Sequence, residues 1–142
     1  MILTIPLKKI EIPGGGMHLA VSVSGNNFQS RAIIDTGASQ SIFHKESIED
    51  FISEIFEIDD DQMSSGVNAM LSGHQMAELN NLNIGPLSLN DIKVGIMDLT
   101  HIRNLYQNQM TLDICGLIGG DVLNKYKAEI NYYKSVLILH KH

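Results

Sequence analysis

The most informative part of this sequence is residues 32–39, which read Ala32-Ile33-Ile34-Asp35-Thr36-Gly37-Ala38-Ser39. An apolar run, typical of a buried strand, ends here in a carboxylate, a hydroxyl residue and a glycine. A carboxylate in this place is held by a rigid element, and Gly37 permits a tight turn directly after it. Backbone amides in that turn can donate to the carboxylate and fix its orientation. An isolated Asp-Thr-Gly would still be explained by an ordinary turn in which the aspartate caps local amides.

A second apolar stretch, rich in glycine, favours a functional role for this Asp-Thr-Gly over an ordinary turn. It reads Cys115-Gly116-Leu117-Ile118-Gly119-Gly120-Asp121-Val122-Leu123 and is followed by Ala-Glu-Ile-Asn-Tyr at 128–132. In this order, and over about residues 21–139, the sequence resembles the retropepsin-like aspartic proteases. The resemblance implies a catalytic strand that ends in Asp-Thr-Gly, and a later apolar-apolar-Gly strand that threads beside it and runs into a short helix. A final strand or hairpin is implied after that helix.

The resemblance also implies a role for each residue of the first motif. Asp35 matches the catalytic aspartate. Thr36 matches the residue whose hydroxyl bonds across a dimer axis, and Gly37 the turn glycine whose amide faces the carboxylate. Ala38 completes the active-site loop, at a position where the pepsin-like branch usually has a serine that donates to the aspartate. An alanine there, as in the retroviral branch, favours activity at weakly acidic rather than strongly acidic pH.

Further segments match the family by their position in the sequence. Residues 117–119 match the apolar strand that packs beside the catalytic loop, and Asp121 lies at the start of the short helix. Residues 63–78 stand where the family has its flap, a hairpin that closes over substrate. The tip of this flap falls anywhere from Gly66 to Gly73, because no diagnostic residue marks it.

The chain contains a single Asp-Thr-Gly, whereas aspartic protease chemistry needs two carboxylates. One ionised carboxylate takes a proton from water while the other, protonated, polarises the scissile carbonyl. A second copy of the chain related by a twofold axis supplies the missing group if residue 35 lies near that axis. We therefore expect a homodimeric aspartic endopeptidase that acts on a polypeptide, with Asp35 from each subunit as the catalytic pair and no cofactor.

Two other readings remain open at this stage. One is a binding or interaction module with the same fold and little peptidase activity, which separated Asp35 carboxylates or a monomer would support. The other is an unrelated β-domain with an accidental motif, which would fail to place Ile118 and Gly119 beside Asp35.

The remaining pattern predicts an all-β, closed barrel-like domain with one or two short helices. Strands are expected at 3–12, 18–24, 28–34, 82–84, 87–97, 128–132 and 136–140, with an Asn26-Asn27 turn. An amphipathic helix is expected at 45–56 and a short one at 99–108. The continuous apolar run 136–139 suits a strand buried on both faces, and with 3–7 it is expected to build the dimer sheet.

Length and composition set further bounds. The 142 residues predict one domain, 1–142, and 44% hydrophobic residues exclude a disordered chain. A net charge of −6 argues against nucleic acid as a partner, and no apolar run is long enough to span a membrane. The first residues do not form a signal peptide, which favours a cytoplasmic location unless a leader has been removed. Six histidines without paired spacing predict no metal site, and Cys115 is expected to be a buried, inert thiol.

Overall fold

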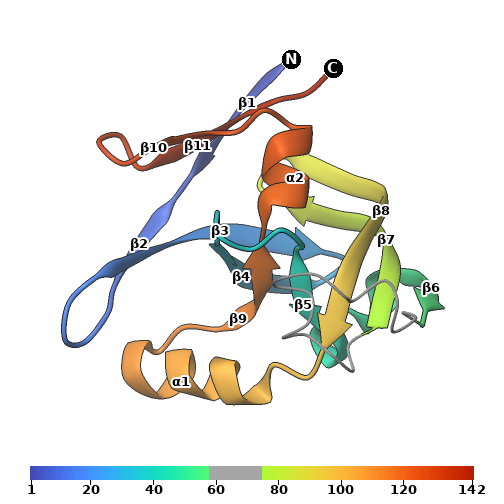
Figure 1. Cartoon of the computed structure of the whole chain (residues 1–142), viewed down its shortest axis with the longest axis horizontal. Helices are drawn as coiled ribbons and strands as arrows, with labels where there is room; N and C mark the ends of the chain where they lie inside the picture. The colour runs from blue at the N-terminus through green and yellow to red at the C-terminus, as the bar shows by residue number, and fades with distance from the viewer. Residues whose placement is uncertain (58–74) are drawn as a thin grey trace.

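The computed structural model describes residues 1–57 and 75–142. Strands dominate these residues (Figure 1): β1 (Ile2–Pro6), β2 (Lys8–Glu11), β3 (Met17–Gly25), β4 (Phe28–Ile34), β5 (Ile42–His44), β6 (Ile52–Phe56), β7 (Gln75–Ile84), β8 (Leu87–Met97), β9 (Ile114–Ile118), β10 (Glu129–Asn131) and β11 (Val136–His140). The α-helices are α1 (Thr100–Met110) and α2 (Gly120–Lys125), and two 3-10 turns span Lys45–Ser47 and Glu49–Phe51.

Six of the strands close into a barrel. The larger sheet has the order β2-β3-β4-β9-β5-β8-β7-β6, and a further pairing of β3 with β7 joins its two sides. Strands β3, β4, β9, β5, β8 and β7 therefore form the closed wall, while β2 and β6 extend it. Alternate residues of these strands fill the interior, among them Val21, Leu79 and Val94, all without solvent exposure. The expectation of an all-β, barrel-like fold with short helices is confirmed.

A tight turn explains why β3 and β4 pair in this register. Gly25 lies opposite Phe28, so Asn26 and Asn27 alone connect β3 to β4, and both have positive φ. Asparagine tolerates this conformation, and the two-residue turn matches the twist of the strands. The hairpin expected at these residues is confirmed.

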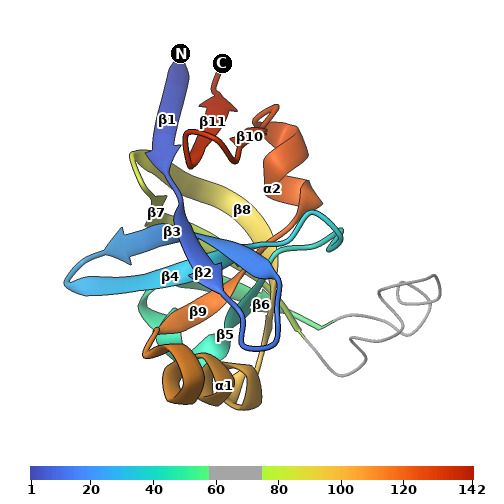
Figure 2. The same cartoon turned by 90° about the vertical axis from the view of Figure 1, so that its left-hand side faces the viewer.

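The two ends of the chain form a separate three-stranded sheet with the order β1-β11-β10. Figure 2 shows the termini side by side, where the backbone N–H of Lys141 donates to the carbonyl of Met1 over 2.8 Å. The single strand expected at 3–12 is wrong. The chain passes between the two sheets at Leu7, whose N–H donates to Ser135, so β1 and β2 belong to different sheets.

Within this single chain, the strand at 136–139 has one buried face and one half-buried face. Leu137 and Leu139 are 1% exposed and join the core, whereas Val136 and Ile138 are half-buried on the opposite face. The strand thus has one core face and one outer face. It is flanked on both edges by strands of its own chain.

The amphipathic helix expected at 45–56 does not form. Ile48 and Phe51 are buried, as the periodicity required, but they lie within or beside the 3-10 turns. Residues 52–56 then form β6, which pairs antiparallel with β7 from Ile52 to Phe56. β-Branched and aromatic residues favour a strand once a partner edge is present, and that edge overrides the helical spacing.

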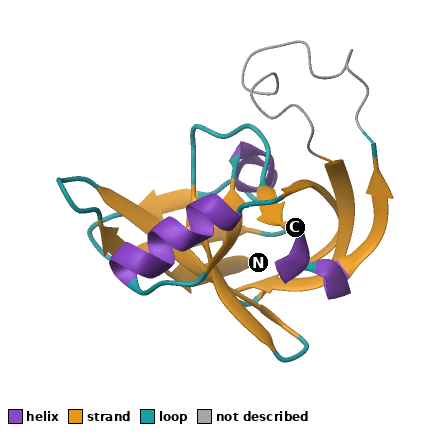
Figure 3. Cartoon of the chain, turned by 90° about the horizontal axis from the view of Figure 1, so that it is seen from below, coloured by secondary structure: helices purple, strands orange, loops and turns teal. Residues whose placement is uncertain are grey.

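Helix α1, expected at 99–108, runs from Thr100 to Met110 and lies across the strands in Figure 3. Its buried residue Tyr106 packs in a second apolar cluster with Ile10, Ala20, Ile33 and Ile114, from β2, β3, β4 and β9. Among the described residues, no helix is long and apolar enough to cross a membrane.

Candidate active site

The Asp35 loop lies where two parallel strands end. β4 and β9 pair in parallel, with Ile34 opposite Ile118, so the segments that follow them leave the same edge of the sheet. The Asp35 N–H continues the ladder by donating to the Ile118 carbonyl over 2.9 Å. Figure 1 shows β9 running directly into α2 beside this loop. The expectation that 117–119 packs beside the Asp35 loop is confirmed, and the interpretation as an unrelated domain with an accidental motif is excluded.

Beyond the loop, the chain returns on the other side of β9. β5 pairs antiparallel with β9 through Ile42 and Phe43, so β9 is threaded between the two strands that the Asp35 loop connects. Gly116 makes this close approach possible. A β-carbon at this position would lie 2.5 Å from the Ile42 carbonyl oxygen and 2.7 Å from the Phe43 ring.

The turn itself holds the Asp35 carboxylate. The Gly37 N–H donates to Asp35 Oδ1 over 3.0 Å, as the sequence resemblance implies. The Ala38 N–H donates to the Asp35 carbonyl over 3.2 Å, which closes the turn. Asp35 is half-buried and Thr36 is exposed, so the carboxylate is anchored on one side and reachable on the other. Donation by an oriented amide stabilises a carboxylate in a defined position.

A buried network ties this loop to α2. The fully buried Ser41 donates its hydroxyl to Asp121 Oδ1 over 2.7 Å and accepts the Gly119 N–H over 2.9 Å. The Ser41 N–H also donates to Asp121 Oδ1, and Gln40 Nε2 donates to Asp121 Oδ2 over 3.0 Å. Farther back, the Ala38 carbonyl accepts the Gly120 N–H over 2.7 Å. Asp121 is therefore a positioning residue for the Asp35 loop.

Sequence reasoning placed Asp121 at the start of the helix but missed its role. The residues joined by this network are about 80 positions apart, so only the parallel pairing of β4 with β9 brings them together. The sequence signal that could have revealed this network was the polar pair Gln40-Ser41 just after the first motif, together with Asp121 in the second stretch. The Ser41 hydroxyl both donates and accepts within this network.

The other reactive side chains are inert or structural. Burial raises the pKa of Cys115 to about 12, so the thiol stays protonated, as expected for a buried cysteine. Within residues 1–57 and 75–142, no group of three or more histidine, cysteine or acidic side chains is placed to hold a metal ion.

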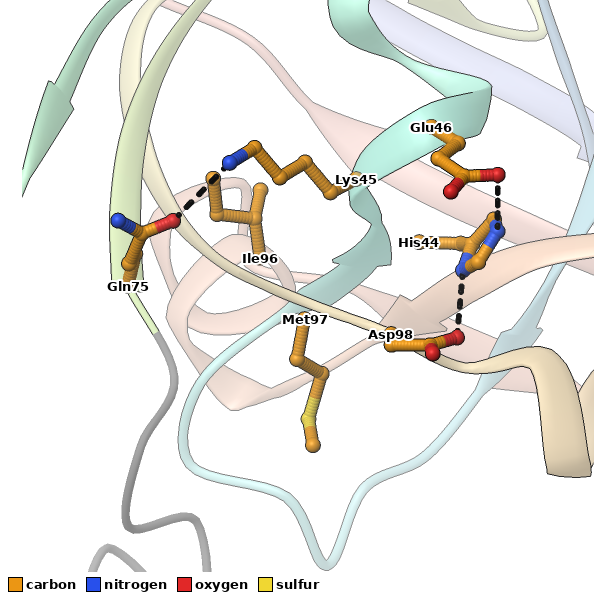
Figure 4. Close-up of a pocket in the computed structure, with 7 residues that line it drawn as sticks. All are labelled: His44, Lys45, Glu46, Gln75, Ile96, Met97 and Asp98. Atoms are coloured by element: carbon orange, nitrogen blue, oxygen red, sulfur yellow. Dashed lines mark hydrogen bonds and ion pairs between the residues drawn. The ribbon is translucent and has the colours of Figure 1, made fainter.

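A pocket lies elsewhere, between the ends of β5 and β8 and the start of β7. It measures about 350 Å³, and Figure 4 shows Lys45 reaching across it to Gln75 over 3.3 Å. The His44 ring is 2% exposed and accepts the Leu99 N–H at Nδ1 over 2.9 Å. Nearby, the Thr100 hydroxyl and then its N–H lower the pKa of Asp98. No residue of the two sequence motifs lines this pocket. The hydrogen bond from the Leu99 N–H to His44 holds the segment after β8 against β5.

The flap expected at 63–78 lies mostly outside the described residues. Only its last four residues are described, and they open β7. Met76 is half-buried opposite Phe56 of β6 and Gly95 of β8, so it packs on the barrel.

Comparison with known proteins bears on this arrangement. A family model described as aspartyl protease matches residues 19–122, which include the Asp35 loop, β9 and the start of α2. The chain belongs to this aspartyl protease family. Its fold is that of the retropepsin-like branch. The crystal structure of a retropepsin-like aspartic protease from Rickettsia conorii superposes on this chain with a TM-score of 0.52 at 22% identity. The match covers 98% of this chain and 90% of that chain.

A second solved structure is similar at a lower level. The retroviral protease-like domain of Ddi1 from Leishmania major gives a TM-score of 0.49 at 18% identity, over 86% of this chain and 84% of that chain. A comparison with curated protein sequences finds no match. The membership in the aspartyl protease family thus rests on the family model, and the Rickettsia structure bears on the fold.

Proposed function

We propose that this chain is a homodimeric aspartic endopeptidase in which the Asp35 carboxylates of two copies activate one water. The observation that carries the proposal is the Asp35 turn: a half-buried carboxylate fixed by the Gly37 N–H, in a sequence that matches the aspartyl protease family. Because each chain has one Asp-Thr-Gly, the second carboxylate must come from a second copy.

The chemistry follows from the sharing of one proton by two close carboxylates, which resist double ionisation. The ionised Asp35 takes a proton from water as the water oxygen attacks the scissile carbonyl carbon. The protonated Asp35 of the second copy gives its proton to the carbonyl oxygen. The resulting tetrahedral diol then gives one hydroxyl proton to the ionised Asp35 of the second copy as the C–N bond breaks, and the departing amine takes the proton held by the first Asp35. The pair is left again with one shared proton.

Three features of the surface support a dimer contact at this end of the molecule. Among the described residues, the exposed Thr36 hydroxyl has no hydrogen-bond partner. Thr36 also borders a hollow of about 280 Å³ that extends along α2 to Lys127 and Ala128, just before β10. The adjoining three-stranded sheet and its β10–β11 turn carry exposed apolar side chains, with Ile2 of β1 64% and Tyr133 of the turn 95% exposed. Both edges of β11 are already paired, so a partner strand could add only at β1 or β10.

Thr36→Ala is expected to weaken the dimer. The proposal places the hydroxyl in a buried bond between subunits, and the loss of a partner there costs about 1–3 kcal/mol. The dissociation constant, measured by analytical ultracentrifugation, should rise roughly tenfold or more. Thr36→Ser, which keeps the hydroxyl, is the matched control and should dissociate like the wild type. Equal constants for Ala and wild type would show that Thr36 lies away from the axis.

Ala38→Ser is expected to move the pH optimum downward. Ala38 offers no side-chain donor to Asp35, so the wild type should work best at weakly acidic pH. A serine hydroxyl that donates to a carboxylate favours its charged form, and one such bond corresponds to roughly one pH unit. The measurement is kcat/KM against pH on one peptide, with Ala38→Gly as the donor-free control. An optimum at strongly acidic pH for the wild type would contradict this reasoning.

The proposed function is tested by peptide-library cleavage at several protein concentrations. Specific activity should fall on dilution through the dimer dissociation constant, because only the dimer holds both carboxylates. A protein that cleaves nothing at any concentration, or that keeps the two Asp35 carboxylates apart in its dimer, would instead be a binding module with this fold.

A further inference from the structure

A polar side chain, His18, lies just beyond the end of the β3–β4 ladder, on the side of Asp35. The ladder ends with Ala20 opposite Ile33, and the same register extended by two residues would set His18 opposite Asp35. Residues two apart on a strand share a face, so His18 lies on the face of Ala20 and Ile33. Both of those residues pack in the second apolar cluster, beneath α1.

Tyr106 of α1 fixes the orientation of the His18 ring. The tyrosine is 6% exposed and packs over Ala20 and Ile33, and its hydroxyl lies 2.7 Å from His18 Nδ1. The two rings are tilted by 47° with their centroids 6.1 Å apart. His18 itself is exposed, and within the described part of the chain its Nε2 forms no hydrogen bond. One ring nitrogen is thus held by the protein and the other faces solvent.

The electrostatics agree with this arrangement. Burial, and second the negative charge of Asp35, raise the pKa of Tyr106, so the carboxylate acts on the hydroxyl that holds His18. A tyrosine hydroxyl can donate to a neutral imidazole or accept from a protonated one, so the contact survives a change of charge.

The other charged groups around His18 are few. On β2, Lys9 and Glu11 flank Ile10, the cross-strand partner of His18. On β4, Arg31 shares the face of Ile33 two positions farther from Asp35. On α1, Arg103 is paired with Asp113 over 2.8 Å. Asp35 is therefore the acidic group next to His18 in the register of β3 and β4.

Resting on the proposed peptidase function, we propose that His18, oriented by Tyr106, is a specificity-determining residue that binds a carboxylate side chain of the substrate close to the scissile bond. A catalytic pair that shares one proton carries a negative charge, which repels an acidic substrate side chain nearby. An imidazolium ring at this place carries a positive charge that offsets the repulsion. The preferred substrate then carries glutamate or aspartate beside the cleavage point.

The test uses matched peptides that differ only by Glu or Gln, at each of the positions flanking the cleaved bond. For the wild type we expect the ratio of kcat/KM for the Glu peptide to that for the Gln peptide to reach about fivefold at one position, or at two positions related by the dimer symmetry. In His18→Gln the ratio should be near one, whereas His18→Lys, which also carries a positive charge, should keep the preference. Tyr106→Phe, which frees the ring, should reduce the preference in part.

The outcomes separate this inference from the function on which it rests. An unchanged Glu-to-Gln ratio in both His18→Gln and Tyr106→Phe would overturn the role of His18 while cleavage of the Gln peptides upholds the peptidase. Wild-type protein that cleaves no peptide would contradict the proposed function, and the inference would fall with it.

Discussion

Replacement of Asp35 by asparagine is expected to abolish peptidase activity while leaving the fold intact. The amide oxygen can still accept the Gly37 N–H, which donates to Oδ1 in the native turn, so the loop keeps its shape. An amide cannot take the proton from water or carry the shared proton, so both steps of the reaction lose their catalytic group. In the proposed dimer the substitution also removes the repulsion between two carboxylates, and the melting temperature should stay the same or rise.

The measurement is the cleavage of a peptide library by both proteins in parallel, with circular dichroism and sedimentation to verify fold and assembly. Asp91→Asn is the matched control, because Asp91 is an exposed aspartate on β8 with a positive φ that asparagine accepts. It makes the same chemical change away from the Asp35 loop and should retain full activity. Comparable cleavage by Asp35→Asn and wild type would end the aspartic protease proposal.

Gly119→Ala is expected to destabilise the fold strongly. A β-carbon at Gly119 would lie 2.7 Å from the Ala38 carbonyl oxygen and 3.0 Å from the Gln40 backbone. Backbone atoms cannot move aside without displacement of the whole Asp35 loop. The change also strains the bond from the Gly119 N–H to the buried Ser41 hydroxyl. Overpacking of this kind costs about 1–3 kcal/mol, and activity should fall with the displaced loop.

The neighbouring glycine provides the control for this prediction. A β-carbon at Gly120 would lie 3.4 Å from the same oxygen, an ordinary contact, and Gly120 begins α2, where alanine is the better helix former. Urea unfolding should therefore show a lowered midpoint for Gly119→Ala and an unchanged or raised midpoint for Gly120→Ala. Equal midpoints would mean that the loop is free to yield.

The barrel and the candidate aspartate could be predicted because their signals are local. Alternating residues mark β3, and the apolar run before Asp35 marks a strand between two neighbours. The same local signals failed at 45–56, where Ile52 and Phe56 keep helical spacing but pair with β7, an edge that no local pattern reveals. The bonds between Ser41 and Asp121 were missed for the same reason, since they depend on which strands become neighbours.

The threading of β9 between β4 and β5 also constrains the order in which the protein can fold. Strand β9 occupies the place between the two arms of the Asp35 loop, and it is synthesised about 80 residues after that loop. Until β9 arrives, the Asp35 N–H lacks the Ile118 carbonyl and Ser41 lacks Asp121. Contacts of such long sequence separation form slowly, because the intervening chain must be closed into a loop first. A growing chain on the ribosome therefore cannot assemble the Asp35 loop until α2 has emerged, which delays the carboxylate geometry until most of the barrel already exists.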